Sequence, residues 1–368
     1  KFNQQHSDIK FKIIEAPSDS NQVEDLYTSS FLLGNSPYDL VYMDIVWTPK
    51  FAAAGWLRDL SDRLTPEAAQ QYLAEDIAGG MYQDKFYRLP FRSDAGMLYY
   101  RQDLLEQAGY QPPETFAQLL TISEDLQQQG LVDWGYAWQG KQSESLAAMF
   151  VEILEGHGAY WVNPDTLEVG LDRPEAIASV EFLRTTIAKK VSPPGVTTYA
   201  EDETRLLFQN GKVAFLRNWP FVYSLAADSA IAGKYQIKPM VHAPGKKSGA
   251  ALGGWGLGIS TTTKHPDAAW QVLEFLSSEE SQREFVLKTG FLPSRVALFN
   301  DPAIVAKYNY YPQLLDVIQN SALRPPISQY AQTSDILQRY LSAAITGKMT
   351  SKAAMQNAAQ ETRNLLER

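Results

Sequence analysis

A glycine-rich segment with a tryptophan at its centre is the most chemically informative part of this sequence. It runs from Ala251 to Ser260 and places Gly253 and Gly254 directly before Trp255. A ligand can approach backbone amides closely where no Cβ intervenes, and the indole ring adds a flat apolar surface. A pyranose has a matching C–H face and hydroxyl edge, so the segment suits a sugar site. A glycine-rich turn with Trp255 in the core explains the motif alone equally well.

Other polar and aromatic residues could complete such a site. Carboxylates accept hydrogen bonds from sugar hydroxyls, guanidinium and amide groups donate to them, and ionised partners strengthen both contacts. The candidate acceptors are Asp44 and Asp94, the candidate donors are Arg92, Arg217, Asn218 and Arg324, and the candidate stacking rings are Trp219 and Trp255. Each also has a structural interpretation, such as a helix cap for Asp44, a turn for Asp94, an internal ion pair for Arg217 and the core for Trp219. The candidates therefore gain weight only together.

Several other chemistries find no support in the sequence. The four histidines, at positions 6, 157, 242 and 265, show no metal-ligand spacing, and the chain has no cysteine. Metal ligation, a histidine general base, thiol catalysis and disulfides are therefore not expected. Neither a phosphate-binding loop nor a dinucleotide fingerprint is present. We expect no catalytic residue, no metal and no cofactor.

Length and charge limit the architecture and the partners. A chain of 368 residues suggests about two domains. Its formal net charge of -9 argues against nucleic acid or an anionic membrane as the main partner, because both require a basic face. The sequence has no run of 18 apolar residues that would predict a membrane helix, and no signal-peptide pattern.

Short apolar runs alternate with helical patterns, which predicts an α/β chain with mainly parallel sheets. We expect strands at 11–14, 38–43, 95–100 and 213–216, and helices beginning near 103, 112, 202 and 265, with two more in the last thirty or so residues. Ligands bind beyond the carboxyl ends of strands in open parallel sheets. Asp44 and Trp219 follow two of the expected strands, so we expect them at one edge of a cleft.

Six segments match the motifs of a known family, in family order and across nearly the whole chain. They are residues 42–47, 89–101, 136–141, 215–220, 252–255 and 324–326. The most specific are Arg-Asn-Trp-Pro at 217–220 and Leu-Gly-Gly-Trp at 252–255. In these segments the chain resembles the substrate-binding proteins of ATP-driven (ABC) sugar importers, within extracellular solute-binding protein family 1, and is most similar to its trehalose/maltose-binding branch.

The resemblance implies an α/β, two-lobed periplasmic-binding-protein fold with hinge-linked lobes and a ligand cleft between them. We expect lobe 1 at 1–95 and 256–321 and lobe 2 at 96–255 and 322–368. The family's first strand and helix have no counterpart, because residues 1–6 resemble the end of that helix. Motif by motif, the residues implied to contact the sugar are Asp44, Asp94, Trp219, Gly253, Gly254, Trp255 and Arg324.

Two departures from trehalose binders concern the ligand. Val23 and Glu24 stand where those proteins carry an arginine, and Arg92 stands where they carry a tyrosine two residues before the second aspartate. We therefore add Arg92 to the ligand-binding set. The resemblance implies an α-glucoside, and the departures leave open trehalose, sucrose, maltose and a shorter glucosylglycerol-like compound.

The function implied is to bind the α-glucoside between the lobes and deliver it to the permease of an ABC importer, with no catalysis. Such a protein is expected to be a monomer in the periplasm or another extracytoplasmic location, with a leader upstream of Lys1 that could carry a lipid anchor. A glycoside hydrolase is the main alternative, with Asp44 and Asp94 as carboxylates about 5–9.5 Å apart. Arg92 lies two residues from Asp94 and favours its ionised form, which disfavours a general acid. A third alternative is a scaffold protein whose tryptophans are core and whose melting temperature no small sugar changes.

Overall fold

The structure is a computed structural model that describes residues 1–17, 19–34 and 36–367. The chain forms two compact units, of which unit 1 comprises Lys1–Asp94, Gly253–Gln319 and Pro326–Tyr330. Unit 2 comprises Ala95–Leu252, Asn320–Pro325 and Ala331–Arg368. Residues 253–255, which the sequence predicts at the end of a segment of lobe 2, belong to unit 1 in the structure.

The central sheet of unit 1 has the strand order β1-β9-β4-β10. Its strands are β1 (Leu40–Asp44), β9 (Leu252–Ile259), β4 (Leu89–Ala95) and β10 (Leu292–Pro293). Strands β1 and β9 are antiparallel, and their register places Asp44 opposite Trp255. Strands β2 (Met81–Tyr82) and β3 (Lys85–Phe86) form a separate antiparallel pair. The register therefore brings two of the predicted site residues together.

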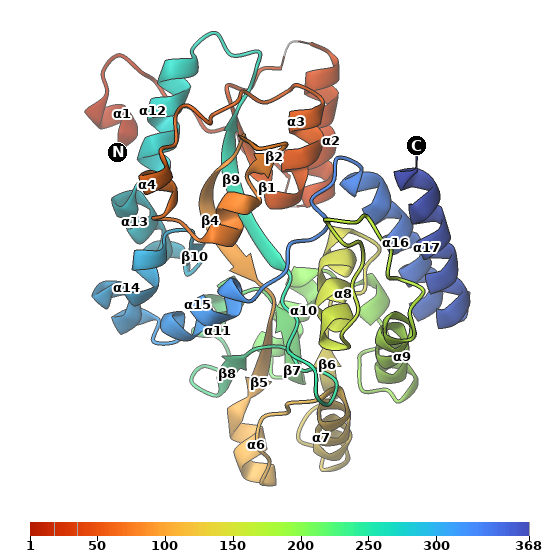
Figure 1. The fold of residues 1–368 in the computed structure, drawn as a ribbon. Coiled ribbons are helices and arrows are strands. Elements are labelled where there is room, and N and C mark those ends of the chain that lie inside the picture. Colours follow the sequence, from red (N-terminus) through yellow and green to blue (C-terminus); the bar gives the residue numbers. More distant parts are fainter. Residues whose placement is uncertain (18, 35, 368) are drawn as a thin grey trace. The chain divides into compact units, whose positions relative to one another are not determined.

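Helices cover both faces of this sheet (Figure 1). On one face, Leu273 of α12 packs in one apolar cluster with Leu257 of β9. On the other face, the ring centres of Phe31 of α2 and Phe51 of α3 lie 5.9 Å apart in an aromatic group. The helices of unit 1 are α1 (Phe2–Gln5), α2 (Ser20–Leu32), η1 (Ile45–Trp47), α3 (Thr48–Ala53), α4 (Pro66–Ala69), α5 (Ala74–Ala78), α12 (Pro266–Ser277), α13 (Glu279–Thr289), η3 (Val296–Asn300), α14 (Pro302–Lys307) and α15 (Tyr311–Gln319).

The sheet of unit 2 has the strand order β6-β7-β5-β8. Its strands are β6 (Trp134–Ala137), β7 (Val213–Asn218), β5 (Met97–Arg101) and β8 (Tyr235–Lys238). Strand β7 is buried along its whole length, with β6 parallel to it on one side and β5 antiparallel on the other. Trp219 follows the last residue of this buried strand, so a rigid element positions it.

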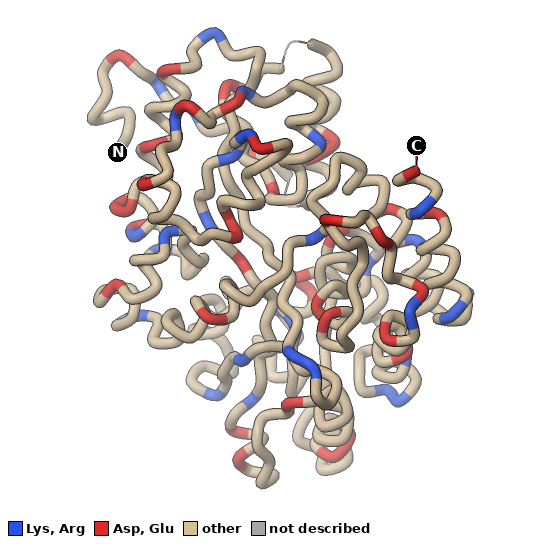
Figure 2. Tube along the Cα trace, viewed as in Figure 1, with Lys and Arg blue, Asp and Glu red and all other residues tan. Residues whose placement is uncertain are grey.

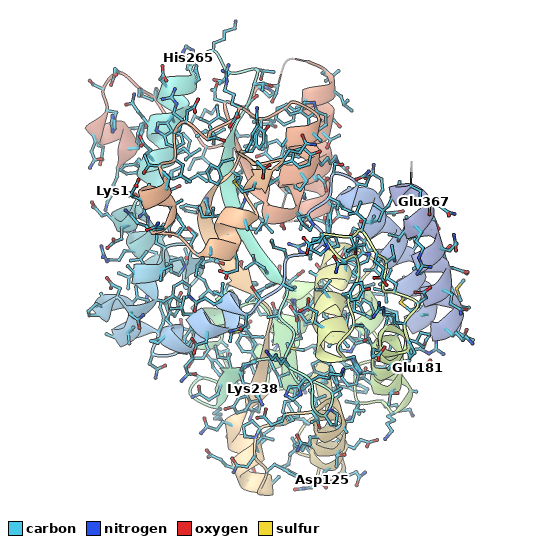
Figure 3. The ribbon with its side chains drawn as sticks, viewed as in Figure 1. Lys1, Asp125, Glu181, Lys238, His265 and Glu367 are labelled. Atoms are coloured by element: carbon cyan, nitrogen blue, oxygen red, sulfur yellow. The ribbon has the colours of Figure 1, made fainter. Side chains whose placement is uncertain are left out.

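The helices of unit 2 are α6 (Gln102–Ala108), α7 (Phe116–Gln128), α8 (Glu144–Gly156), α9 (Pro174–Ala188), η2 (Val196–Thr198), α10 (Glu201–Gln209), α11 (Phe221–Ala226), α16 (Tyr330–Ile345) and α17 (Ser351–Leu366). Helices α16 and α17 lie side by side (Figure 1), joined by an Arg339–Glu361 ion pair of 2.7 Å. Lys238, labelled in Figure 3, donates to the carbonyl oxygen of Pro113 at 2.6 Å and ties β8 to the segment before α7.

The predicted helices near 103, 112, 202 and 265 and the two at the carboxyl end are confirmed. Their signals are local. Thr115 and Gln118 form a capping box at the start of α7, and Gly109 ends α6 in the left-handed conformation. The prediction of a strand at 11–14 is wrong. The backbone amide of Phe11 donates a hydrogen bond to the side chain of Asn3 and not to a neighbouring strand.

The expectation of mainly parallel sheets is also wrong. The pairs β1–β9, β4–β10, β5–β7 and β5–β8 are antiparallel, and β6–β7 is parallel. A helical crossover makes successive strands parallel. Strand β5 instead follows β4 directly through Gly96, and a loop without a helix leads from β8 to β9, although the strands of each couple belong to different sheets. Strands β5 and β9 therefore enter their sheets from the other unit, and no helical crossover within the sheet sets their direction.

Gly96 is required by close packing inside unit 2. A Cβ at this position would overlap the carboxylate of Glu152 and the guanidinium of Arg217. We expect Gly96→Ala to lower the free energy of unfolding by about 3 kcal/mol, because it displaces a buried ion pair. Urea denaturation measures this loss.

Gly109→Ala is the matched control. Gly109 has a φ of 76° and no atom within 4 Å of its would-be Cβ, so alanine there adds only backbone strain of about 1 kcal/mol. Equal losses in the two variants would show that Gly96 is not needed to make room for the ion pair.

Candidate functional site

In unit 1, the predicted site residues gather around Trp255. The indole of this partly exposed residue lies 4.9 Å from the Tyr42 ring and 5.2 Å from the Trp47 ring, between ring centres. Asp44 is its strand partner, and the guanidinium of Arg92 lies 5.7 Å from its ring centre. We call Tyr42, Asp44, Trp47, Arg92, Asp94 and Trp255 the Trp255 cluster.

Arg92 connects the polar and aromatic members of this cluster. Its Nε donates to the Tyr42 hydroxyl at 3.0 Å, and its Nη1 forms an ion pair with Asp94. The side chains of Arg92 and Asp94 are 13% and 8% exposed. Burial raises the pKa of Tyr42, which keeps its phenol protonated. A neutral hydroxyl, a guanidinium and a carboxylate therefore lie beside an indole face.

Asp44 and Gly254 also have structural roles. A carboxylate oxygen of Asp44 accepts a hydrogen bond from the amide of Val46 at 3.3 Å, which caps η1. Gly254 has a φ of 129°, and a Cβ there would lie 2.9 Å from the Arg92 carbonyl oxygen. Only glycine fits this backbone. The helix-cap interpretation of Asp44 is thus confirmed, and neither role excludes contact with a ligand.

Two buried ionisable residues lie near the glycine segment, and no sequence pattern predicts them. Asp76 and Arg88 are fully buried, and Nη1 of Arg88 donates to the carbonyl oxygen of Asp76 at 3.4 Å. One carboxylate oxygen of Asp76 would lie 3.2 Å from a Cβ on Gly254. Burial raises the pKa of Asp76 to about 7, although the charge of Arg88 opposes this shift. No local sequence pattern predicts the burial of Asp76, because this burial depends on residues distant in sequence, such as Arg88 and Gly254.

In unit 2, a second group surrounds Trp219. The guanidinium of Arg217 lies over the indole, 4.2 Å from the ring centre. Arg217 also makes a two-pronged ion pair with Glu152, and neither side chain is exposed. Asn218 is buried and accepts from the Trp219 amide at 2.8 Å. The internal ion-pair interpretation of Arg217 is therefore confirmed.

The start of α8 contacts Arg324 directly and Trp219 through Glu201. Glu144 pairs with Arg324 at 2.5 Å, and the adjacent Ser145 donates to Glu201 at 2.7 Å. Glu201 in turn accepts from the indole Nε1 of Trp219 at 3.2 Å. Arg324 is 2% exposed, whereas Trp219 is half-buried. We call Glu144, Ser145, Glu201, Arg217, Trp219 and Arg324 the Trp219 cluster.

The structure thus assembles the predicted residues in two groups. Asp44, Arg92, Asp94, Gly253, Gly254 and Trp255 lie in unit 1, and Trp219 and Arg324 lie in unit 2. Asp44 is the last residue of β1 and Trp219 follows β7, and these strands belong to different sheets, so the meeting of the two residues at one cleft edge stays a prediction. In the described part of the chain, no group of acidic or histidine side chains could hold a metal ion.

Charge and membrane character also bear on the partners. Figure 2 shows Lys and Arg interspersed with Asp and Glu along the surface helices of each unit. None of the helices built from described residues has the length and apolar character needed to cross a membrane.

Residues 1–283 match the model of a family described as bacterial extracellular solute-binding protein. The match covers more than half of the chain. The chain belongs to this family. Among solved structures, this solute-binding protein is similar to the maltose-bound MalE3 of T. maritima, with 35% identity, a TM-score of 0.94 and coverage of 99% of this chain and 94% of the other. The predicted two-lobed periplasmic-binding-protein fold of mixed α/β type is confirmed.

Curated relatives agree on this class. A probable ABC transporter-binding protein of Deinococcus radiodurans is 29% identical over 353 residues, which are 93% of this chain and 82% of the relative. A mannitol-binding protein of Pseudomonas aeruginosa is 24% identical over 393 residues, covering 100% of this chain and 88% of the relative. These relatives are named as binding proteins and not as enzymes.

The raised pKa of Asp76 makes stability depend on pH. A carboxyl with a pKa of 3.8 when unfolded and about 7 when folded stabilises the fold below pH 4, and this contribution is lost as the pH rises through 7. We expect the free energy of unfolding to fall by about 2 kcal/mol more between pH 5 and pH 8 in the unaltered protein than in Asp76→Asn. Urea denaturation at both pH values measures the difference.

Asp62→Asn, which changes an exposed aspartate of the same unit, is the control. It should keep the pH dependence of the unaltered protein. Identical pH dependence in Asp76→Asn and the unaltered protein would contradict the assignment.

Proposed function

We propose that this solute-binding protein binds an α-glucoside and delivers it to the permease of an ABC importer. The observation that carries the proposal is the Trp255 cluster, in which a partly exposed indole lies beside the ion-paired Arg92 and Asp94. This pairing of chemistries suits a pyranose, because its C–H face stacks on an aromatic ring while its hydroxyls form stronger hydrogen bonds with charged acceptors and donors.

The Arg92–Asp94 pair suits a ligand with adjacent hydroxyls. A carboxylate oxygen that accepts from Arg92 retains further lone pairs, and the guanidinium retains further N–H groups. One hydroxyl can donate to Asp94 while its neighbour accepts from Arg92. In this proposal the ion pair is kept when the sugar binds, so neither charge is left buried without a partner.

The Trp219 cluster contributes a second set of contacts in this proposal. Trp219 supplies a second apolar ring, and Arg324, which pairs with Glu144, belongs to the same proposed site. We propose that both clusters act on one ligand. Binding that engages both units would favour a closed form over an open one, because only the closed form makes all contacts.

The maltose-bound relative supports an α-glucoside as the ligand, since it shares 35% identity over nearly the whole chain. The mannitol-binding relative shows that the ligand varies among more distant relatives. Trehalose, sucrose, maltose and a glucosylglycerol-like compound are the candidates. An extracytoplasmic location and a monomeric state belong to the same proposal.

The hydrolase alternative is not supported. The matched family consists of binding proteins. Asp94 is engaged by Arg92 and Asp44 caps η1, so both carboxylates have structural partners. Incubation with an aryl α-glucoside should release no phenol.

Calorimetric titration with the four candidate sugars tests the function directly. We expect one of them to bind with a change in tryptophan fluorescence, because two tryptophans lie in the proposed site. Mannitol serves as the comparison, since it is a linear polyol without a pyranose face. Binding of mannitol alone, or of none of the five compounds, would contradict the proposal.

Substitution of Trp255 tests the site. We expect Trp255→Ala to raise the Kd of the sugar that binds at least about 30-fold, or about 2 kcal/mol, because the stacking surface is lost. Trp56→Ala is the control in the same unit, since Trp56 stacks on Phe31 at 5.1 Å outside the Trp255 cluster. Circular dichroism checks that both variants are folded, and an unchanged Kd in Trp255→Ala would remove this ring from the site.

Asp94→Asn tests the polar half of the same cluster. The amide keeps the size of the side chain but loses the charge that pairs with Arg92 and accepts from hydroxyls. We expect the Kd to rise at least about 10-fold, which calorimetry measures. Asp62→Asn, an exposed change of the same kind in unit 1, should leave it unaltered.

A further inference from the structure

We propose that Glu201 is a positioning residue that fixes the Trp219 ring, so that this tryptophan offers the ligand one apolar face and no polar group. The inference rests on the proposed function, because it concerns how Trp219 serves as a stacking ring. Glu201 is not among the candidate site residues that the sequence motifs indicate.

The first constraint on Trp219 acts at the edge of its ring. Its Nε1 donates to one carboxylate oxygen of Glu201 at 3.2 Å. The other oxygen of Glu201 accepts from Ser145 at 2.7 Å, so the carboxylate is itself held at both oxygens. Glu201 is the first residue of α10, where the positive end of the helix dipole favours a negative charge. A charged acceptor strengthens the bond to the indole N–H.

The second constraint acts on one face of the ring. Arg217 lies over the indole at 4.2 Å from the ring centre, and its guanidinium cannot rotate freely because Glu152 binds it through two nitrogens. Both members of that ion pair are fully buried. A cation placed over an indole is attracted by the ring quadrupole. The bond at the edge and the cation on the face together define the plane of the Trp219 ring.

These constraints determine what Trp219 can recognise. Its only polar atom is already bound to Glu201, and Arg217 occupies one face. The remaining face carries no hydrogen-bonding atom, so it suits the C–H face of a pyranose and is insensitive to the configuration of hydroxyls that point away. A linear polyol has no rigid C–H face of this kind. We therefore infer that the Trp219 cluster selects a ring sugar, whereas Arg92 and Asp94 read its hydroxyls.

A double-mutant cycle with Trp219→Phe tests this role, with the α-glucoside that binds in calorimetry as the probe. We expect Glu201→Ala to raise the Kd about 5- to 10-fold by freeing the ring. Glu201→Gln should largely restore affinity, because its amide oxygen can still accept from the indole. In the Trp219→Phe background, Glu201→Ala should cause no further loss, because phenylalanine has no N–H. An equal loss in both backgrounds would overturn the inference.

A second measurement needs no ligand. The indole ¹H–¹⁵N resonance of Trp219, identified by its absence in Trp219→Phe, should move upfield in Glu201→Ala and stay near its position in Glu201→Gln. Glu203→Ala is the matched control, because it removes the same charge from the same helix. Glu203 accepts a hydrogen bond from the Ala200 amide at 2.9 Å and not from the indole of Trp219. An unmoved resonance in Glu201→Ala would overturn the role of Glu201 but leave the proposed function standing. Failure of the unaltered protein to bind any sugar would overturn the proposed function, and the ligand role of Trp219 with it.

Discussion

The fully buried ion pair between Arg217 and Glu152 is the interaction on which the organisation of unit 2 depends. It joins the central strand β7 to helix α8, and neither side chain is exposed to solvent. Burial raises the pKa of Glu152 against the opposing charge of Arg217. Removing one partner of such a pair typically costs about 3–5 kcal/mol. The chain therefore has to keep both charges, and Gly96 leaves the space that they fill.

The Trp255 cluster of unit 1 distributes its charge differently. Arg92 is shared among the Tyr42 hydroxyl, the Asp94 carboxylate and the rings of Trp255 and Phe291, the last with 4.4 Å between the guanidinium and the ring centre. These side chains are less completely buried than the pair in unit 2. A hydroxyl can therefore join the network without displacing a fully desolvated charge. This difference explains why we assign hydroxyl recognition to unit 1 and ring stacking alone to Trp219.

The sequence predicted what local signals determine and missed what distant contacts determine. Helix α7 was predictable because its capping box lies within four residues. Arg217 and Asn218 resemble exposed donors in the sequence because the apolar run ends at Leu216, whereas strand β7 continues to Asn218 and buries both. Glu201 meets Trp219 across 18 residues, and Asp76 lies beside Gly254. Strand direction also escaped prediction, because β5 enters the sheet of unit 2 directly from β4 of unit 1 and not through a helical crossover within its own sheet.

The two tryptophans reach a fixed orientation by different means, and this bears on the free energy of binding. Ordering a mobile side chain when a ligand binds costs about 0.5–1.5 kcal/mol. Trp255 is packed against the rings of Tyr42 and Trp47, so neighbouring aromatic surfaces hold it. Trp219 is held by a hydrogen bond at its edge and a cation on its face. In both cases the folded chain has already ordered the ring, so most of the stacking energy remains available for affinity. Packing therefore orders one ring, and contacts with charged groups order the other; because Arg217 and Glu152 are fully buried, salt screens their hold on Trp219 only weakly.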